Sequence, residues 1–464
     1  MAKQKTQYVC QQCGWAHPKW VGQCQSCGEW QSMVEEQVVA EVSSLSSRPT
    51  TPKESAEIIT FPQVKGMSAG KNRISTTIPE FDRVLGSDGV QQGMVPGAVM
   101  LIGGEPGIGK STILTQVAIS VVLDGGSEQP VVYVCGEESP SQIVIRIKRF
   151  LESLPKSGQL QWKKLQERLQ FITTTDVDRV VNAMREVRPQ MMIVDSIQTM
   201  TTTALTGLAG SVGQVRESAD RLTTAAKELN VPLFLVGHVT KDGTISGPKI
   251  LEHIVDAVLE LSGERTGELR MLRAIKNRFG ATDEVGVFRM QSFGYESVEN
   301  PSALFLDQAD ERVAGSATIS VVEGTRPFLV EVQALVVSSQ LAMPRRVGRG
   351  VDLSRIQVLS AVLQKHCRLP LGMNDIFVNV AGGFTIREPA VDLGLAVAIA
   401  SSLKNKPLPS KTVFIGEVGL QGEIRTVSLL DRRVKEAKRL GYKNIISRSE
   451  HKRLEEVLKQ FGLL

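Results

Sequence analysis

The sequence predicts an α/β protein in three parts: a small cysteine-rich unit, a parallel sheet flanked by helices, and a second α/β domain. Over residues 66–290, apolar runs of strand length alternate with helical patterns, which is typical of a parallel sheet. A glycine-rich loop lies between the first of these runs and a helical stretch. Four of the six cysteines lie within the first 27 residues, which sets the N-terminal segment apart.

The order of the expected elements defines the domain boundaries. The central part has strand-like runs at residues 98–102, 131–135, 190–194, 231–236 and 255–261. After a break rich in Pro and Gly, a second pattern predicts strands near 317–322, 328–337, 376–380 and 412–415, and helices near 352–366, 389–402 and 429–440. We therefore expect a cysteine-rich unit over 1–33, a polar linker over 34–65, and domains over 66–295 and 300–464.

The overall composition is that of an ordinary folded protein, since 42% of the residues are hydrophobic and 22% are charged. The formal net charge of +5 permits a polyanionic partner. No apolar run approaches the roughly 18 residues of a membrane span, and the N-terminus has no apolar signal core. We therefore expect a cytoplasmic protein that has no membrane partner.

Two C-x-x-C pairs dominate the N-terminal unit: Cys10 with Cys13, and Cys24 with Cys27. A glycine follows each pair and suits the tight turns that bring four thiolates together. Four sulfur ligands predict a closed structural site for Zn²⁺. A redox-active pair is the alternative, but a unit that is too small to fold alone favours zinc.

The glycine-rich loop contains G-x-x-x-x-G-K-S, the phosphate-binding pattern of nucleotide hydrolases. Its backbone N–H groups and the start of the following helix favour a phosphate chain. Lys110 would place a charge at the β and γ phosphates, and the Ser111 hydroxyl would bind Mg²⁺. The residues expected to bind ATP are Gly104, Glu105, Pro106, Gly107, Ile108, Gly109, Lys110, Ser111 and Thr112.

Three other strand-like runs end next to polar residues that could complete a hydrolytic site. One ends at Asp195, which would hold Mg²⁺ through water. Another leads to Glu137 and Glu138, of which we assign Glu137 as the catalytic base and keep Glu138 as the alternative. In the non-catalytic interpretation, these acids only interact favourably with the dipole at the start of a helix. The third run ends before His238, which is either a γ-phosphate sensor or an ordinary surface histidine.

Two segments rich in small and polar residues, 201–213 and 240–249, follow predicted strands. Loops in such places either bind DNA or are plain surface loops. In the first interpretation, Lys241 and Lys249 would contact DNA phosphates with little dependence on base sequence.

Three segments together carry a resemblance to one family. They are the four-cysteine unit, the phosphate loop and the pentad Lys276-Asn277-Arg278-Phe279-Gly280. Over essentially its whole length the chain resembles the bacterial DNA repair proteins RadA, also called Sms. The resemblance implies a RecA-like ATPase core and a DnaB-like ring: a homo-hexameric motor on single-stranded and branched DNA that drives branch migration. It also implies the RecA recombinase as a partner.

The pentad also has a physical interpretation. Lys276 and Arg278 are two residues apart, so on an extended hairpin they point the same way. In a DnaB-like ring such a pair reaches the γ-phosphate of the neighbouring subunit, and we therefore expect both to act in trans. A basic hairpin that binds DNA directly is the alternative.

The segment from about residue 316 resembles the proteolytic domain of Lon proteases, whose fold is like domain 2 of ribosomal protein S5. That family uses a Ser–Lys dyad. When the segments are aligned on Gly394, Asp392 replaces the serine, and Asp431 replaces the lysine. An ionised carboxylate has no proton to give to a base, so we expect no peptidase activity and instead a scaffold for assembly and DNA contact.

Four arginines, Arg345, Arg346, Arg349 and Arg355, cluster around a stretch where Gly and Pro predict a loop. They form either a contact for the duplex backbone or a solvated basic surface. The leading functional prediction is a DNA-dependent ATPase and branch-migration motor. A scaffold that binds DNA under ATP control and assists the recombinase without moving is the alternative.

Overall fold

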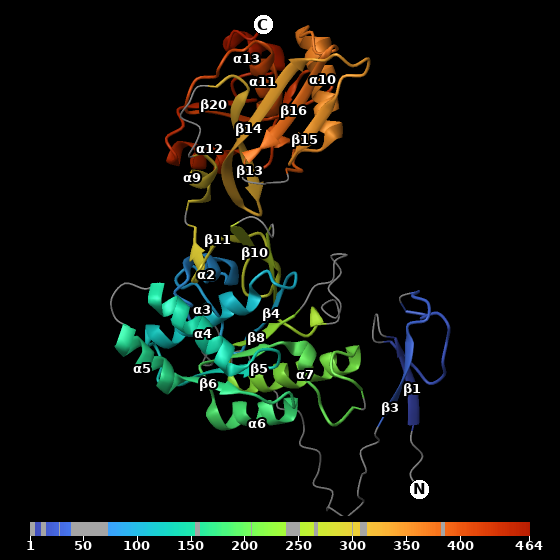
Figure 1. The fold of residues 1–464 in the computed structure, drawn as a ribbon, viewed down its shortest axis with the longest axis vertical. Coiled ribbons are helices and arrows are strands. Elements are labelled where there is room, and N and C mark those ends of the chain that lie inside the picture. The colour runs from blue at the N-terminus through green and yellow to red at the C-terminus, as the bar shows by residue number, and fades with distance from the viewer. Residues whose placement is uncertain are drawn as a thin grey trace, which may run out of the picture. The chain divides into compact units, whose positions relative to one another are not determined.

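The computed structural model describes residues 5–10, 15–26, 28–38, 73–153, 158–205, 207–237, 251–263, 268–298, 300–306, 313–381 and 386–464. The chain divides into two compact units, Met1–Ser297 and Val298–Leu464 (Figure 1). Five residues singled out above lie outside the described ranges: Cys13, Cys27, His238, Lys241 and Lys249.

The N-terminal segment forms a small antiparallel sheet in the order β2-β1-β3. Its strands are β1 (Lys5–Cys10), β2 (Ala16–His17) and β3 (Met33–Val38). Buried Cys10, Cys24 and Met33 form its small core. Among the described residues, these few buried side chains provide little apolar stabilisation, and a bound metal ion would add to it.

A nine-stranded sheet in the order β12-β11-β10-β9-β4-β8-β7-β5-β6 forms the centre of the domain that follows. Six neighbouring strands are parallel: β9 (Ala257–Ser262), β4 (Val99–Gly103), β8 (Leu233–Val236), β7 (Met191–Asp195), β5 (Val131–Cys135) and β6 (Leu169–Ile172). The predicted parallel sheet is therefore confirmed, and five of its strands coincide with the predicted apolar runs.

Three antiparallel strands extend this sheet beyond the prediction. They are β10 (Leu269–Asn277), β11 (Val285–Gln291) and β12 (Gly294–Ser297). Buried and partly exposed positions alternate along β10, where Arg270 and Arg273 interrupt the apolar residues. A run of this kind lacks the continuous apolar stretch of a buried parallel strand, which explains why the sequence pattern did not predict it.

Helices cover both faces of the parallel strands (Figure 1). Even-numbered and odd-numbered residues of β4 belong to different core clusters, because successive side chains point to opposite faces. One face packs against α3 (Lys110–Asp124), α4 (Pro140–Ser153) and α5 (Gly158–Arg168). The other packs against α6 (Val177–Val187) and α7 (Val212–Leu229). A short helix, α2 (Pro79–Leu85), packs on β10 and β11.

The second unit has a six-stranded sheet in the order β15-β16-β14-β13-β17-β20. The strands are β13 (Ser316–Glu323), β14 (Arg326–Ser338), β15 (Arg346–Arg349), β16 (Asn374–Val380), β17 (Thr412–Ile415) and β20 (Asn444–Ser447). The principal helices are α10 (Leu353–Cys367), α11 (Asp392–Leu403), α12 (Leu430–Arg439) and α13 (Leu454–Gln460). The buried helix α11 packs on β13 and β14.

One sequence expectation is wrong in this unit. The loop predicted around the arginine cluster contains the edge strand β15, which pairs in parallel with β16. Backbone hydrogen bonds to β16 hold residues 346–349 extended, although Gly348 lies within the strand. None of the helices in the described ranges is long and apolar enough to cross a bilayer.

Candidate functional site

The phosphate loop, residues 104–112, connects the carboxyl end of β4 to α3. Helix α3 begins at Lys110, so its N–H groups and its positive end face the loop. Gly109 has a φ of +105°, and a Cβ there would lie 2.2 Å from the hydroxyl oxygen of Tyr295. Glycine is therefore required at this position both by the backbone conformation and by the close approach of Tyr295.

Lys110 is 5% exposed, and its ammonium donates to the carbonyls of Gly104 at 2.9 Å and Glu105 at 3.1 Å. Burial lowers the pKa of Lys110, while the charges of Asp195 and Glu137 oppose this shift. The loop thus holds a buried cation that faces two carboxylates. This combination of charges fits a triphosphate with a divalent cation, because the phosphates match the lysine and the metal matches the acids.

Asp195 ends β7 and is buried. Burial raises its pKa, and hydrogen bonds from the hydroxyls of Ser111 and Tyr133 counteract that effect. The Tyr133 hydroxyl donates to Oδ2 of Asp195 at 2.7 Å. Ser111 and Asp195 therefore bring two oxygen ligands together at the loop, and this donor set fits Mg²⁺. The peptide bond between Asp195 and Ser196 is cis.

The two acids that follow β5 have different surroundings. The backbone amides of Gly136 and Glu137 donate to the carbonyl of Asp195 at 2.7 and 3.2 Å, which fixes Glu137 next to β7. The Glu137 carboxylate accepts a hydrogen bond from the Ser196 hydroxyl. In contrast, Glu138 accepts from Arg146 at 2.8 Å through each of its oxygens. An arginine thus neutralises Glu138, whereas the charge of Glu137 acts on Lys110.

Tyr295, on β12, supports the phosphate loop from behind. Its hydroxyl donates to the carbonyl of Ile108 at 2.6 Å, and its backbone is paired with the Gln116 side chain of α3 at 2.7 and 2.9 Å. Burial raises the pKa of Tyr295 to about 12, so the phenol keeps its proton at physiological pH. The extra antiparallel strands therefore fix the conformation of the loop.

The pentad 276–280 begins at the end of β10 and packs against the carboxyl end of α2. The Asn277 amide donates to the carbonyls of Val84 and Leu85 at 3.2 and 3.1 Å, and its oxygen accepts the amide of Phe279 at 2.9 Å. Gly280 packs so closely that a Cβ there would lie 2.9 Å from the Cα of Gly86. The amide and the glycine thus shape the turn that presents the two cations of the pentad.

Both cations of the pentad contact the segment 252–256. The Lys276 ammonium donates to the carbonyl of Glu252 and, at 2.8 Å, to that of Val255. Arg278 Nη1 lies 3.1 Å from Oδ1 of Asp256. The ammonium of Lys227 lies 3.2 Å from the same oxygen. Three cations, Lys227, Lys276 and Arg278, therefore form a group around the buried carboxylate of Asp256.

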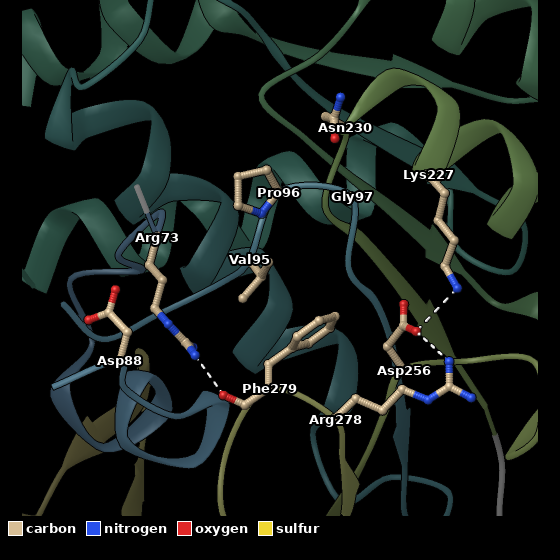
Figure 2. A pocket seen from close by; sticks show the side chains of 10 residues that line it. All are labelled: Arg73, Asp88, Val95, Pro96, Gly97, Lys227, Asn230, Asp256, Arg278 and Phe279. Carbon is tan, nitrogen blue, oxygen red and sulfur yellow. Dashed lines mark hydrogen bonds and ion pairs between the residues drawn. The ribbon is translucent and has the colours of Figure 1, made fainter. Parts of the chain in front are cut away.

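A cavity of about 610 Å³ adjoins this group (Figure 2). It is lined by Arg73, Asp88, Val95, Pro96, Gly97, Lys227, Asn230, Asp256, Arg278 and Phe279. The backbone of Asp256 donates to the carbonyl of Val99 at 2.9 Å, so the cavity lies at the amino end of β4. The phosphate loop lies at the carboxyl end of the same strand.

In the N-terminal unit, the two described cysteines are buried and make equivalent backbone hydrogen bonds. The amide of Cys10 donates to the carbonyl of Trp15, and the amide of Cys24 donates to that of Glu29, both at 2.9 Å. Both amides thus bond the carbonyl of the fifth residue after the cysteine, a repeated contact that suits two similar zinc knuckles. These equivalent hydrogen bonds and the burial of the two thiols fit zinc.

In the second unit, the positions aligned with the Ser–Lys dyad hold two carboxyl groups in different settings. Asp392 begins α11, and burial raises its pKa to about 6. Asp431 lies exposed on α12. A fully buried arginine of α12, Arg433, forms an ion pair with Glu388.

The arginine cluster separates into two pairs. Arg346 donates to the carbonyls of Asn374 at 2.5 Å and Leu371 at 3.0 Å, and burial lowers its pKa. Arg355 donates to the carbonyls of Glu388 and Arg387. In contrast, Arg345 and Arg349 are exposed.

Sequence reasoning gave no role to several residues around the nucleotide site and the pentad: Tyr133, Ser196, Lys227, Asp256, Asn277 and Tyr295. Two of them carry a signal that could have been used. Tyr133 is the hydroxyl-bearing residue in an otherwise apolar run, and Asp256 is an acid at the start of one. Ser196 and Asn277 lie next to predicted site residues in the sequence, whereas Lys227 and Tyr295 come close to the site only through the fold.

A parallel sheet with a phosphate loop at one strand end, and two acids on neighbouring strands, defines a P-loop ATPase. Residues 74–284 match the ATPase family KaiC, residues 8–35 match the rubredoxin metal binding domain, and residues 333–450 match subunit ChlI of Mg-chelatase. Proteins named DNA repair protein RadA are 45% identical in Halalkalibacterium halodurans, 46% in Pseudomonas aeruginosa and 42% in Bacillus subtilis. Each of these alignments covers 96% of this chain and 93% of the relative. The chain belongs to the family of DNA repair proteins RadA.

Among solved structures, one ATPase domain is similar with a TM-score of 0.41 and 13% identity. That similarity covers 52% of this chain and 96% of the solved domain.

Proposed function

We propose that this chain is a DNA-dependent ATPase of recombinational repair that assembles into a homo-hexameric ring, moves on single-stranded DNA and drives branch migration. The observation that carries this proposal is the position of Lys276 and Arg278. They lie at the amino end of β4, whereas the phosphate loop lies at its carboxyl end. Five strand residues span about 15 Å, so these cations lie too far from the phosphate loop of their own subunit to contact its nucleotide, which supports action in trans.

A site that one subunit begins and the next completes favours a head-to-tail arrangement. Such contacts are heterologous, and they generate a ring when the rotation closes. Hydrolysis then depends on subunit contact, because Lys276 and Arg278 stabilise transition-state charge only in the assembled ring. A motor needs this dependence because its subunits must hydrolyse ATP one after another around the ring.

The residues of the phosphate loop and the two carboxylates would then divide the chemistry. Lys110 binds the β and γ phosphates, Ser111 and Asp195 hold Mg²⁺, and Glu137 orients and polarises the attacking water. ATP supplies the free energy of the cycle. Glu138 has a structural role, since Arg146 neutralises it.

DNA and protein partners would bind to the surface of the assembled protein. We assign backbone contact with DNA to Lys241, Lys249, Arg345 and Arg349, and a structural role to Arg346. We assign binding of the RecA recombinase to the N-terminal zinc unit. The protein would act in the cytoplasm. The second unit serves as a scaffold without peptidase activity, because carboxylates replace both members of the dyad.

The test compares the parent, Lys110→Ala and Arg278→Ala proteins on joint molecules made by a recombinase. We expect the parent to consume ATP faster with single-stranded DNA and to extend the joints, and both variants to do neither. Arg278→Ala subunits mixed into the parent should also lower the rate per parental subunit. An unchanged rate at every ratio would contradict action in trans.

The same assay separates the motor from the scaffold that assists the recombinase without moving. If Lys110→Ala promotes joint formation as well as the parent does, and the parent does not extend preformed joints, the scaffold is the correct interpretation. The buried Lys110 with its two facing carboxylates favours turnover, and therefore the motor.

A further inference from the structure

The charged residues that line the cavity beside the pentad fall into two groups. Arg73 and Asp88 are engaged with the backbone around them. Arg73 donates to the carbonyls of Phe279 at 2.6 Å and Gly93 at 2.9 Å, and Asp88 accepts two amides of its own turn. The exposed charge that remains at the cavity therefore belongs to Lys227 and Arg278.

Lys227 and Arg278 reach the cavity from different elements and converge on one carboxylate (Figure 2). Lys227 is on the last turn of α7, and Arg278 follows β10. The Asp256 side chain is 4% exposed, whereas those of Lys227 and Arg278 are 45% and 52% exposed. The anion is thus fixed in the wall, and the ends of both cations face the open space.

The group carries more positive than negative charge. Burial lowers the pKa of Lys276, and the positive charges of Arg278 and Lys227 lower it further, which places the three cations within electrostatic reach of one another. The carboxylates of Asp256 and Glu252 oppose this shift. Three cations therefore face two carboxylates, and an added anion would be stabilised there.

We propose that Lys227 is a third phosphate-binding cation. The cavity receives the terminal phosphates of the nucleotide held by the neighbouring subunit, and phosphate oxygens replace Asp256 as the partner of Lys227 and Arg278. This inference depends on the proposed trans action of the pentad. It adds a residue 49 positions away from Lys276 in the sequence, on a different element.

The exchange of partners is physically simple. Lysine and arginine have flexible stems, and both heads already face the cavity, so a small rotation moves them from carboxylate to phosphate. Asp256 stays in place because its Oδ2 accepts the amide of Val99 at 3.1 Å. In the unassembled subunit Asp256 therefore holds the two cations ready, which lowers the entropy cost of binding phosphate.

The test is complementation between two inactive proteins. Lys227→Ala subunits keep their phosphate loop, and Lys110→Ala subunits keep their cation group. Rings assembled from mixed stocks place some intact loops next to intact cation groups. We expect each variant alone to hydrolyse ATP more slowly than the parent, with a loss of about tenfold or more for Lys227→Ala. The mixture should recover part of the hydrolysis rate, with a maximum when the two variants are present in equal amounts.

Two controls separate phosphate binding from folding. Lys227→Arg keeps the charge and should retain most of the activity. Lys163→Ala removes an exposed cation on α5, a helix that contributes no residue to the cavity, and should behave like the parent. If Lys227 only stabilised its own subunit, Lys227→Ala would damage its own phosphate loop, and mixing with Lys110→Ala would not restore hydrolysis.

The outcomes also distinguish this inference from the function on which it depends. If Lys227→Ala hydrolyses ATP like the parent while Arg278→Ala is inactive, the third cation is ruled out and the trans action of the pentad stands. The inference is equally overturned if Lys227→Ala is inactive and the mixture stays inactive. If neither substitution lowers hydrolysis, the proposed trans mechanism fails as well.

Discussion

At the scale of single residues, Glu137 and Glu138 show how neighbours in sequence can differ in chemistry. Both follow β5, but the Glu138 carboxylate is held by Arg146 and the charge of Glu137 reaches Lys110. A general base must be an ionised acceptor that a water molecule can approach. Because an arginine already occupies both Glu138 oxygens, the geometry favours Glu137 as the base.

Glu137→Gln should therefore abolish hydrolysis while leaving nucleotide binding intact. Loss of a general base costs about 10²- to 10⁴-fold in rate. The measurement is phosphate release in the presence of single-stranded DNA, together with the affinity for a fluorescent ATP analogue. Glu138→Gln is the matched control and should change the rate only a few-fold. The reverse pattern, a silent Glu137→Gln and an inactive Glu138→Gln, would reassign the base.

At the scale of elements, β12 and α11 each place one buried polar side chain where it has a measurable consequence. Tyr295→Phe removes the donor to the carbonyl of Ile108 and leaves that acceptor buried. Such a loss costs about 1–3 kcal/mol. We expect a higher KM for ATP, because the phosphate loop is less well held, and little change in kcat once ATP is bound. A Tyr295→Phe protein with the KM of the parent would show that β12 does not position the loop.

Helix α11 begins with a carboxyl group that folding makes harder to ionise. The pKa of Asp392 is raised from 3.8 to about 6 by burial. The folded chain thus binds a proton more tightly than the unfolded chain does. Its contribution to stability is present below pH 3.8 and is lost as the pH rises through 6. Above that pH the ionised group is a cost of about 1–3 kcal/mol.

Asp392→Asn should remove this cost and stabilise the second unit at neutral pH. Arg355 keeps the carbonyls of Glu388 and Arg387 as acceptors, so the substitution does not strand it. Hydrogen exchange of the α11 amides, followed between pH 4 and pH 8, measures the effect. The gain over the parent should grow up to about pH 6 and then stay constant. Asp431→Asn, on exposed α12, is the control and should show no gain.

The elements also show what a sequence can predict. Continuous apolar runs such as residues 131–135 predicted buried parallel strands, because five consecutive apolar residues fit few other environments. The phosphate loop was predictable because its chemistry lies within nine consecutive residues. The association of Arg278 with Lys227 and Asp256 was not predictable, since no local pattern links residues on α7, before β9 and after β10. The topology of the sheet brings them together.

At the scale of the whole molecule, the basic surface must be separated into cations that hold the fold and cations that face solvent. Adjacent residues illustrate the difference: Arg345 is exposed, whereas Arg346 bonds the carbonyls of Leu371 and Asn374. The sequence alone could not separate them, because both have the same charge and the same local pattern. Only cations that face solvent can exchange counterions for DNA phosphates.

The double substitution Arg345→Ala with Arg349→Ala should therefore weaken DNA binding and reduce its dependence on salt. Removing one phosphate contact lowers the slope of log affinity against log salt by about 0.9 for duplex DNA, so the slope should fall by about 2. The matched control, Lys404→Ala with Lys435→Ala, removes two exposed cations of the same unit outside the cluster. Arg346→Ala should lower the stability of the unit, because it leaves backbone carbonyls of Leu371 and Asn374 without their donor. If the slope is the same for parent and double variant, Arg345 and Arg349 belong to a solvated surface, and the DNA contact lies elsewhere on the chain.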